Sequence, residues 1–97
     1  MTDVITVVAD LKAKPGKEEA LRNAALALVE PTRKEQGCIQ YDLHLHLTDP
    51  GRVVFFENWA TVEDLNRHGQ SPHLKAFGAM AADLVESRNV ERFRRIA

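Results

Sequence analysis

The sequence predicts an α+β fold in which an antiparallel sheet of four strands is covered by helices on one face. Segments rich in β-branched or alternating apolar residues recur along the chain. Segments with apolar residues at three- and four-residue spacing separate them. The 97 residues, 44% of them hydrophobic and 28% charged, are typical of one ordinary globular domain. We therefore expect a single domain over residues 1–97, with its core between about 4 and 94.

The first half of the chain predicts a strand followed by a helix. Residues 4–11 are rich in β-branched side chains without helical periodicity, which favours a buried strand. A turn at Pro15 and Gly16 ends it, and the acidic residues 18–19 then suit the positive end of a helix dipole. Pro31 should kink this helix, or end it so that it restarts through Lys34.

The second half predicts a hairpin, two helices and a last strand. Residues 38–47 alternate, with Ile39, Tyr41 and the following odd-numbered residues on one face. A turn over 48–52 leads into a return strand over 53–59. One helix should begin at Thr61, where a hydroxyl and the Asp64 carboxylate three residues on match a capping pattern, and should end at His68. Another should open at Ser71 and Pro72, residue types that suit the first positions of a helix. The last strand is expected over 89–96.

This β-α-β-β-α-α-β order, with right-handed crossovers, indicates a ferredoxin-like arrangement. One face of the sheet would then lack a cover. A chain this small buries a limited fraction of its surface, so the apolar residues on that second face need a cover. A second copy presenting the same face would supply it. We expect a homodimer.

Charge and composition argue against several classes of function. A formal net charge of −1 offers no electrostatic attraction to nucleic acid or to a membrane surface. Residues 1–3 do not resemble the start of a signal peptide, and no apolar run approaches the ~18 residues of a membrane span. Cys38 is the single cysteine, so no intramolecular disulfide can form. The expected location is the cytoplasm.

The four histidines do not match a metal motif. His44 and His46 point the same way on a strand, but two ligands do not make a site. His68 and His73 lie on either side of a helix break, so they lack a fixed ligand spacing, although they could converge in space. No metal site is predicted.

A second group of residues suggests a binding pocket. Phe55, Glu57 and Trp59 share one face of a strand, and a carboxylate between two aromatics must find a partner. His68 and His73 follow at two helix ends. A purely structural alternative is that Trp59 fills the core, Glu57 accepts a hydrogen bond, and the histidines are polar helix termini. A pocket with an aromatic wall and an imidazole is the functional alternative.

Several motifs together resemble the antibiotic biosynthesis monooxygenase (ABM) family, and its small quinol-monooxygenase-like branch most closely. They are P-G at 15–16, E-Q-G-C at 35–38 followed by Tyr41, E-N-W at 57–59, and H-x-x-S-P-H-x-x-x-F at 68–77. The similarity extends over nearly the whole chain. The strand end E-x-W followed by H-x-x-[ST]-P-H is its most specific part.

The resemblance implies a homodimer with facing sheets, a dimeric α/β barrel-like assembly, and a pocket between sheet and helices in each subunit. Such proteins oxygenate quinols or hydroxylated aromatics with O₂ and without metal, flavin or haem, because the deprotonated substrate itself gives an electron to oxygen. The protein binds the ring, takes the hydroxyl proton and keeps the anion dry. The implied roles are: proton acceptor, His73 or His68; ring contacts, Trp59, Phe55 and Phe77; orienting groups, Glu57, Asn58 and Tyr41.

Other activities of related proteins define the alternatives. The haem-degrading branch relies on an Asn on the first strand and a His on the last long helix. Ala9 and Gly78 stand at about these positions here, which argues against haem breakdown. An isomerase of a small phosphorylated dione from autoinducer breakdown is a second enzyme hypothesis. A non-catalytic dimeric module that binds a small molecule is a third hypothesis.

Overall fold

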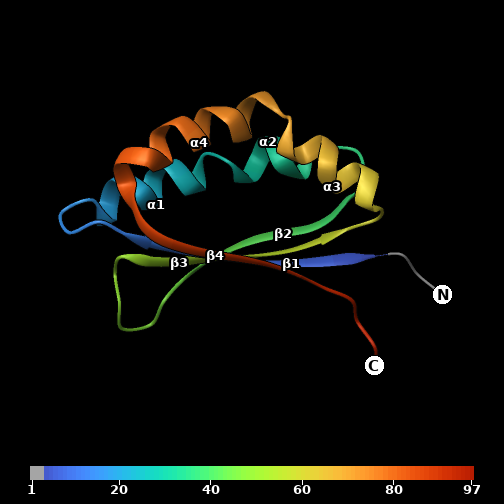
Figure 1. Ribbon diagram of the computed structural model, residues 1–97, viewed down its shortest axis with the longest axis horizontal. Helices are drawn as coiled ribbons and strands as arrows, with labels where there is room; N and C mark the ends of the chain where they lie inside the picture. The colour runs from blue at the N-terminus through green and yellow to red at the C-terminus, as the bar shows by residue number, and fades with distance from the viewer. Residues whose placement is uncertain (1–3) are drawn as a thin grey trace.

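A computed structural model describes residues 4–97 as a four-stranded antiparallel sheet with helices packed on one face (Figure 1). The elements are, in order, β1 (Ile5–Ala13), α1 (Glu18–Leu26), α2 (Val29–Arg33), β2 (Cys38–Leu45), β3 (Arg52–Trp59), α3 (Val62–Gly69), α4 (Pro72–Leu84) and β4 (Val85–Phe93). The strands lie in the order β2-β3-β1-β4, and each neighbouring pair is antiparallel. The predicted ferredoxin-like α+β fold is thus confirmed. Residues 1–3, on which the signal-peptide argument rested, lie outside the described part.

The first helical segment ends and restarts, which is one of the two outcomes expected, but the break comes at residues 27–28 and therefore before Pro31. α1 ends at Leu26, and α2 begins at Val29. Pro31 lies in the first turn of α2, where its missing N–H costs no helical hydrogen bond. The restart directs the chain toward Glu35, which stands between α2 and β2.

The caps of α3 and α4 follow the sequence signals closely. The Thr61 hydroxyl accepts a hydrogen bond from the Asp64 amide (3.0 Å), and the Ser71 hydroxyl accepts one from the Leu74 amide (3.3 Å). The Ser71 hydroxyl also donates to the carbonyl oxygen of His68 at 2.7 Å. One serine therefore ties the end of α3 to the start of α4.

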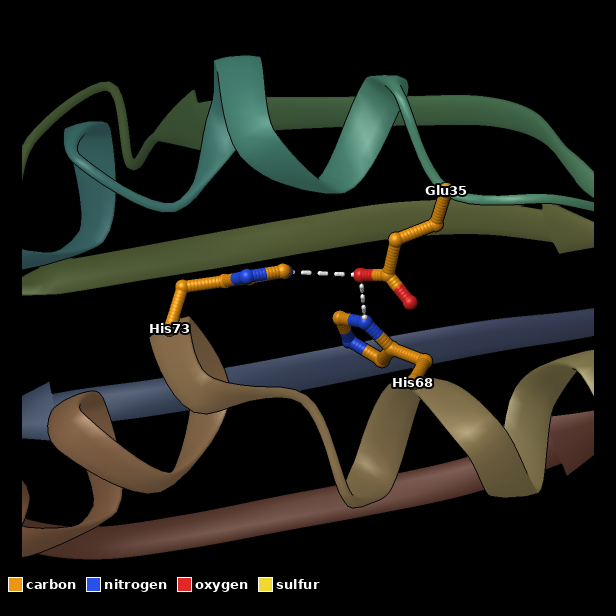
Figure 2. A group of neighbouring side chains, drawn as sticks. All are labelled: Glu35, His68 and His73. Carbon is orange, nitrogen blue, oxygen red and sulfur yellow. Dashed lines mark hydrogen bonds and ion pairs between the residues drawn. The ribbon is translucent and has the colours of Figure 1, made fainter.

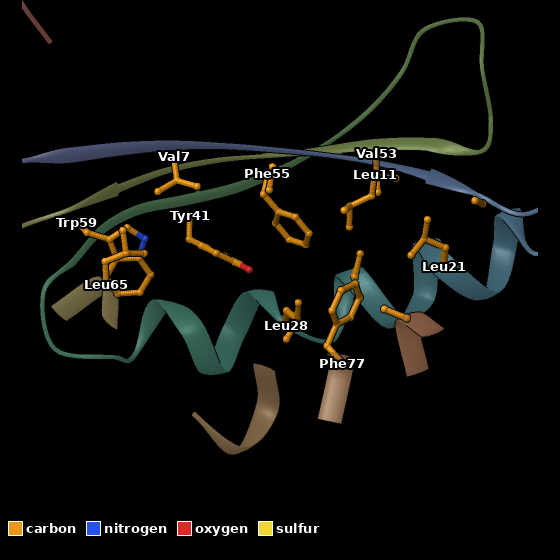
Figure 3. Close-up of a cluster of buried hydrophobic side chains, with 14 residues drawn as sticks. Val7, Leu11, Leu21, Leu28, Tyr41, Val53, Phe55, Trp59, Leu65 and Phe77 are labelled. Carbon is orange, nitrogen blue, oxygen red and sulfur yellow. The ribbon is translucent and has the colours of Figure 1, made fainter. Parts of the chain in front are cut away.

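The core lies between the sheet and the helices (Figure 3). Alternate residues of β1 and β3 face the helices and are buried. Phe55 packs against Tyr41 of β2 with ring centroids 5.1 Å apart. Leu21, Leu28 and Phe77 belong to the same cluster and lie on its helix side. Trp59 is fully buried at one end of this layer. Burial of these side chains is the main driving force that holds the helices on the sheet.

The opposite face of the sheet lacks a covering layer (Figure 1). It carries exposed apolar side chains. Phe56 and Phe93 are 36% and 49% exposed, and Ile39 is 58% exposed. The prediction that Ile39 shares a face with Tyr41 was wrong. The pairing of β2 with β3 shifts register between Cys38 and Gln40, and this irregularity turns Ile39 out of the strict alternation.

The last strand starts earlier than predicted. β4 runs from Val85 to Phe93, whereas the sequence indicated 89–96. Residues 86–89 are polar and show no strand pattern, but Ser87 pairs with Lys12 of β1, and this pairing imposes the strand. β4 ends at Phe93, the partner of Thr6, because β1 itself begins only one residue before Thr6.

The described residues contain no helix that is long and apolar enough to cross a membrane.

Candidate active site

A cavity of about 250 Å³ lies between the helix-facing side of the sheet and helices α3 and α4. Its wall is mainly apolar, and the polar side chains that reach it are few. This composition is typical of sites that bind small organic molecules. The apolar wall consists of Val7, Ala9, Leu11, Leu28, Phe55, Leu65, Leu74, Phe77 and Val90, and the polar side chains are Tyr41, Glu57, His68 and Arg92.

One row of residues across the sheet forms part of the cavity wall. Tyr41 pairs with Glu57, Glu57 pairs with Val7, and Val7 pairs with Arg92, so that each strand contributes one residue. Paired residues point to the same side of a sheet, and neighbouring strands are ~4.8 Å apart. The pairing therefore places a phenol, a carboxyl and a guanidinium along one line across the sheet, on the side that faces the cavity.

His68 enters the cavity from the last turn of α3. Its side chain is 6% exposed and packs against Trp59, with ring centroids 4.7 Å apart, and against the edge of Tyr41 at 5.6 Å. The hydrogen bond from Ser71 to the His68 carbonyl oxygen fixes the backbone at this position. The imidazole is thus held in one orientation by packing and by the helix end.

Glu35 joins the two helix-end histidines (Figure 2). Its Oε2 lies 2.7 Å from Nδ1 of His68 and 2.7 Å from Nε2 of His73. A carboxylate only accepts hydrogen bonds, so these two ring nitrogens carry the hydrogens. Neutral His68 then has its lone pair on Nε2, which has no hydrogen-bond partner among the described residues. The imidazole that carries this free Nε2 acceptor is part of the cavity lining.

Glu57 is a buried carboxyl with one donor. Its Oε1 accepts a hydrogen bond of 2.9 Å from the indole N–H of Trp59. Burial raises the pKa of Glu57 to about 7, the indole hydrogen bond opposes this rise, and the nearby charge of Glu35 adds to it. Near neutral pH the group is therefore divided between its protonated and ionised forms.

Tyr41 and Arg92 complete the polar side of the cavity. Burial, together with the charge of Glu57, raises the pKa of the Tyr41 phenol far above its usual value, so it stays a neutral hydrogen-bond donor. Arg92 makes no ion pair within residues 4–97 and is exposed on β4 at the cavity edge. Both groups can donate to an oxygen of a bound molecule.

The structure brings five of the eight predicted site residues to the cavity wall. These are Tyr41, Phe55, Glu57, His68 and Phe77. Trp59 does not line the cavity, but it supports both His68 and Glu57 from behind. His73 also lies outside the wall. It shares the Glu35 carboxylate with His68, and the centroids of the two imidazole rings lie 6.1 Å apart.

Asn58 is not part of this arrangement, because it follows Glu57 in the strand and points to the open face of the sheet. There it accepts a hydrogen bond from Thr6 (2.6 Å) and donates one to Gln40 (2.7 Å). It lines a separate hollow on that face together with Phe56 and Phe93. Alternation along β3 already predicts opposite faces for Glu57 and Asn58.

Two residues of the site had no assigned role in the sequence. Glu35 belongs to one of the motifs, but its partners lie 33 and 38 residues further along the chain. Arg92 was one of several arginines near the chain end, and only the pairing with Val7 places it on the cavity side. A carboxylate shared by two histidines that are distant in sequence leaves no local sequence pattern, so only the packing of α3 and α4 on the sheet reveals it.

His44 and His46 do not share a ligand arrangement. Nδ1 of His44 lies 3.3 Å from the Val54 carbonyl oxygen, and Nδ1 of His46 accepts from the Thr48 and Asp49 amides in the hairpin turn. Within residues 4–97, the group of histidine and carboxylate side chains with donor atoms close enough for a metal ion is Glu35, His68 and His73.

Solved structures with the same fold include proteins of similar length. The crystal structure of PA3566 from Pseudomonas aeruginosa has a TM-score of 0.96 at 34% identity, over 100% of this chain and 98% of that one. The structure of Rv0793 from Mycobacterium tuberculosis has a TM-score of 0.90 at 30% identity, over 97% of this chain and 96% of that one.

Sequence relatives carry monooxygenase names. Rv0793, provisionally named a monooxygenase, is 35% identical over 85 residues, which are 88% of this chain and 83% of Rv0793. "Probable quinol monooxygenase YgiN" from Escherichia coli is 28% identical over 94 residues, covering 86% of this chain and 90% of YgiN. The chain spans only 56% of the length of another relative, the uncharacterized protein sll1783 from Synechocystis, at 34% identity over 86% of this chain.

The sequence profile of the family described as "Antibiotic biosynthesis monooxygenase" matches residues 4–80, which include β1 through most of α4. The names of the relatives that align with most of this chain support a monooxygenase-like function. The chain therefore belongs to the antibiotic biosynthesis monooxygenase family.

Proposed function

We propose that this protein is a cofactor-independent monooxygenase that oxidises a quinol or a related hydroxylated aromatic with O₂. The observation that carries the proposal is the placement of His68 between Glu35 and the cavity. Its Nδ1–H is bound by the Glu35 carboxylate, and its free Nε2 belongs to a ring that lines a mainly apolar cavity. A neutral imidazole held in this way is suited to accept a proton from a substrate hydroxyl.

The first step is binding of the ring. Phe55 and Phe77 supply flat apolar surface, and the surrounding aliphatic side chains exclude water. The neutral Tyr41 phenol donates to a substrate oxygen, and Arg92 balances the negative charge that appears on deprotonation. Tight enclosure strengthens both interactions, because charges interact more strongly away from water.

The second step is transfer of the hydroxyl proton to Nε2 of His68. The imidazolium that forms keeps its Nδ1–H on the Glu35 carboxylate, which stabilises the new positive charge. His73 donates to the same Oε2 and holds the carboxylate in place. Trp59 stacks beside the ring and limits its rotation.

The third step is reaction of the substrate anion with O₂. The electron-rich anion gives electrons to O₂, one oxygen atom forms a bond to the ring carbon, and the other leaves as water. A quinol supplies all four electrons that O₂ requires: two as it becomes a quinone and two as a ring C–H becomes C–OH. Its two hydroxyl hydrogens end in the water, and the ring hydrogen displaced at the attacked carbon ends on the new hydroxyl group, so the product is a hydroxyquinone. The protein contributes orientation and proton transfer, and it supplies no redox group of its own.

The name "Probable quinol monooxygenase YgiN" supports the substrate class, and the monooxygenase name of Rv0793 supports the reaction class. We extend the quinol class to this chain because the cavity combines a proton acceptor with an aromatic and aliphatic wall.

Oxygen uptake with a panel of quinols tests the proposal. His68→Asn keeps an amide donor near Glu35 but removes the proton acceptor, so we expect turnover to fall by about 10²- to 10⁴-fold, the usual contribution of general base catalysis. His44→Asn, at an exposed histidine outside the cavity, is the matched control and should retain full activity. Equal rates for wild type and His68→Asn would contradict the assigned role.

Treatment with a chelator tests whether the reaction is independent of a metal ion. The proposed reaction needs only the substrate anion and O₂, so extensive chelation should leave oxygen uptake unchanged. Loss of activity that returns on addition of Fe²⁺ or Cu²⁺ would contradict it. Formation of product without O₂ would instead favour an isomerase, and tight binding of aromatic compounds without any turnover would favour a binding module.

A further inference from the structure

We propose that Glu35, His68 and His73 also form a binding site for a divalent transition-metal ion, with Zn²⁺ as the simplest example, and that its occupation switches off the base in the cavity. The binding site stands on the geometry of these three residues alone. The inhibitory effect rests in addition on the role proposed above for His68.

The donor set fits such an ion. Two imidazole nitrogens and one carboxylate oxygen are a common set of three protein ligands for Zn²⁺, and they leave a fourth position for water. The same donors suit Fe²⁺, Cu²⁺ and Ni²⁺. Mg²⁺ and Ca²⁺ prefer oxygen ligands and should bind poorly here.

The three donor atoms already converge. All of them lie within 4.8 Å of one another, and Oε2 of Glu35 is 2.7 Å from each ring nitrogen. Tetrahedral coordination at metal–ligand distances of about 2.0–2.2 Å separates ligand atoms by about 3.3 Å. Side-chain movements of about 1 Å would therefore convert the hydrogen-bonded group into a coordinating one, with the metal in place of the two shared hydrogens.

The backbone holds the ligands at this spacing. Ser71 ties the end of α3 to the start of α4 through its bonds to the His68 carbonyl oxygen and the Leu74 amide. Solvent can reach the group, because the side chains of Glu35 and His73 are 15% and 22% exposed. An entry path and fixed ligands are the usual requirements of a metal site.

Metal binding would reverse the hydrogen position on His68. A metal on Nδ1 needs the lone pair of that nitrogen, so the hydrogen of the neutral ring must sit on Nε2. Nε2 would then present a donor to the cavity in place of an acceptor. The ion would also withdraw the Glu35 carboxylate from its role of stabilising an imidazolium. Both changes remove the proton acceptor without filling the cavity.

Calorimetric titration of the metal-free full-length chain with Zn²⁺ tests the site directly. We expect Glu35→Gln and His73→Ala each to weaken binding by at least about tenfold, since even the loss of a residue that only supports a ligand costs about 10–100-fold. His44→Ala and His46→Ala are matched controls for the exposed histidines and should leave the main binding event unchanged. No binding by the wild type, or equal affinity in wild type and both ligand variants, would overturn the site.

Oxygen uptake with an active quinol, measured during a Zn²⁺ titration, tests the switch. We expect inhibition with a midpoint that matches the calorimetric Kd and that shifts by the same factor in His73→Ala. Zn²⁺ binding without inhibition, or stimulation by Zn²⁺ or Fe²⁺, would overturn the inhibitory effect. Zn²⁺ binding that depends on the three residues, in a protein that turns over no quinol, would support the site and contradict the proposed function instead.

Discussion

Glu57 shows how strongly burial in this cavity changes the pKa of a side chain. The carboxyl is 5% exposed, and its one hydrogen bond from Trp59 does not replace the water it has lost. Its pKa of about 7 follows mainly from this burial. In the proposed reaction, a partly ionised carboxyl beside the substrate can exchange protons with it during oxygen transfer.

The raised pKa of Glu57 predicts a pH-dependent loss of stability. Below pH ~4.5 the carboxyl is protonated in both the folded and the unfolded chain. Between pH ~4.5 and ~7 the unfolded chain releases the proton and the folded chain keeps it, so the free energy of unfolding decreases as pH rises. The difference between the two pKa values corresponds to at most about 3 kcal/mol.

Urea unfolding of wild type and Glu57→Gln at pH 5 and pH 8 measures this effect. The amide can still accept the Trp59 hydrogen bond, so the variant should lose less stability than the wild type between the two pH values. Glu63→Gln, at an exposed position on α3, is the control and should change with pH as the wild type does. An identical pH response of Glu57→Gln and wild type would show that the carboxyl ionises normally.

Sequence reasoning reached some site residues and not others for identifiable reasons. Alternation along one strand was enough to place Phe55, Glu57 and Trp59 on one face. The sequence did not predict a role for Glu35, because that role depends on contacts with two helix ends far along the chain. The proximity of His68 and His73 was open in the sequence, and the carboxylate between them only appears once the helices pack on the sheet.

At the level of elements, the turn around Gly37 positions the end of the fold that holds Glu35 and His68. Gly37 has φ of 83°, and a Cβ at this residue would lie 2.1 Å from the nearest carboxylate oxygen of Asp64 on α3. The Gly37 carbonyl oxygen also accepts from the Ala60 amide at 2.8 Å. The close approach sets how near α3, and therefore His68, can come to Glu35.

Substitution of Gly37 by alanine should be strongly destabilising. The left-handed backbone alone costs about 1–2 kcal/mol for a residue with a side chain, and the clash with Asp64 should add about 1–3 kcal/mol. Gly16→Ala is a matched control, because Gly16 has the same φ of 83° with open space around it. Thermal or urea unfolding of both variants separates the two effects. Equal losses would mean that the contact with Asp64 relaxes at no cost.

Element boundaries show where local patterns fail. Helix starts at Thr61 and Ser71 were predictable because their capping hydrogen bonds involve neighbours in sequence. The first half of β4 and the outward turn of Ile39 were not, because pairing with another strand determines both. Sequence patterns thus predicted the order of elements better than the register between strands.

At the scale of the whole molecule, the uncovered sheet face is the main feature without a partner. Ile39, Phe56 and Phe93 lie around one hollow on this face. Exposed apolar surface of this kind favours association, and a second copy with the same face would satisfy it by two-fold symmetry. We propose that the protein is a homodimer with facing sheets, as the resemblance to the family implies.

A charged substitution on the open face should separate the dimer. Phe56→Glu would place two carboxylates in an apolar interface, so we expect its mass by light scattering to shift from twice 10.9 kDa toward 10.9 kDa at micromolar concentration. Val62→Glu, at a similarly exposed position on α3, should remain dimeric. A wild type that is monomeric at this concentration would contradict the dimer.

The central claim is that a His68-dependent reaction inserts one atom of O₂ into a quinol. Mass spectrometry of the product formed under isotopically labelled O₂ tests it most directly. The account predicts one labelled oxygen atom per product molecule, the other atom in water, and a near-complete loss of labelled product in His68→Asn. Product oxygen that comes from unlabelled water, or labelled product formed equally fast by His68→Asn, would contradict it.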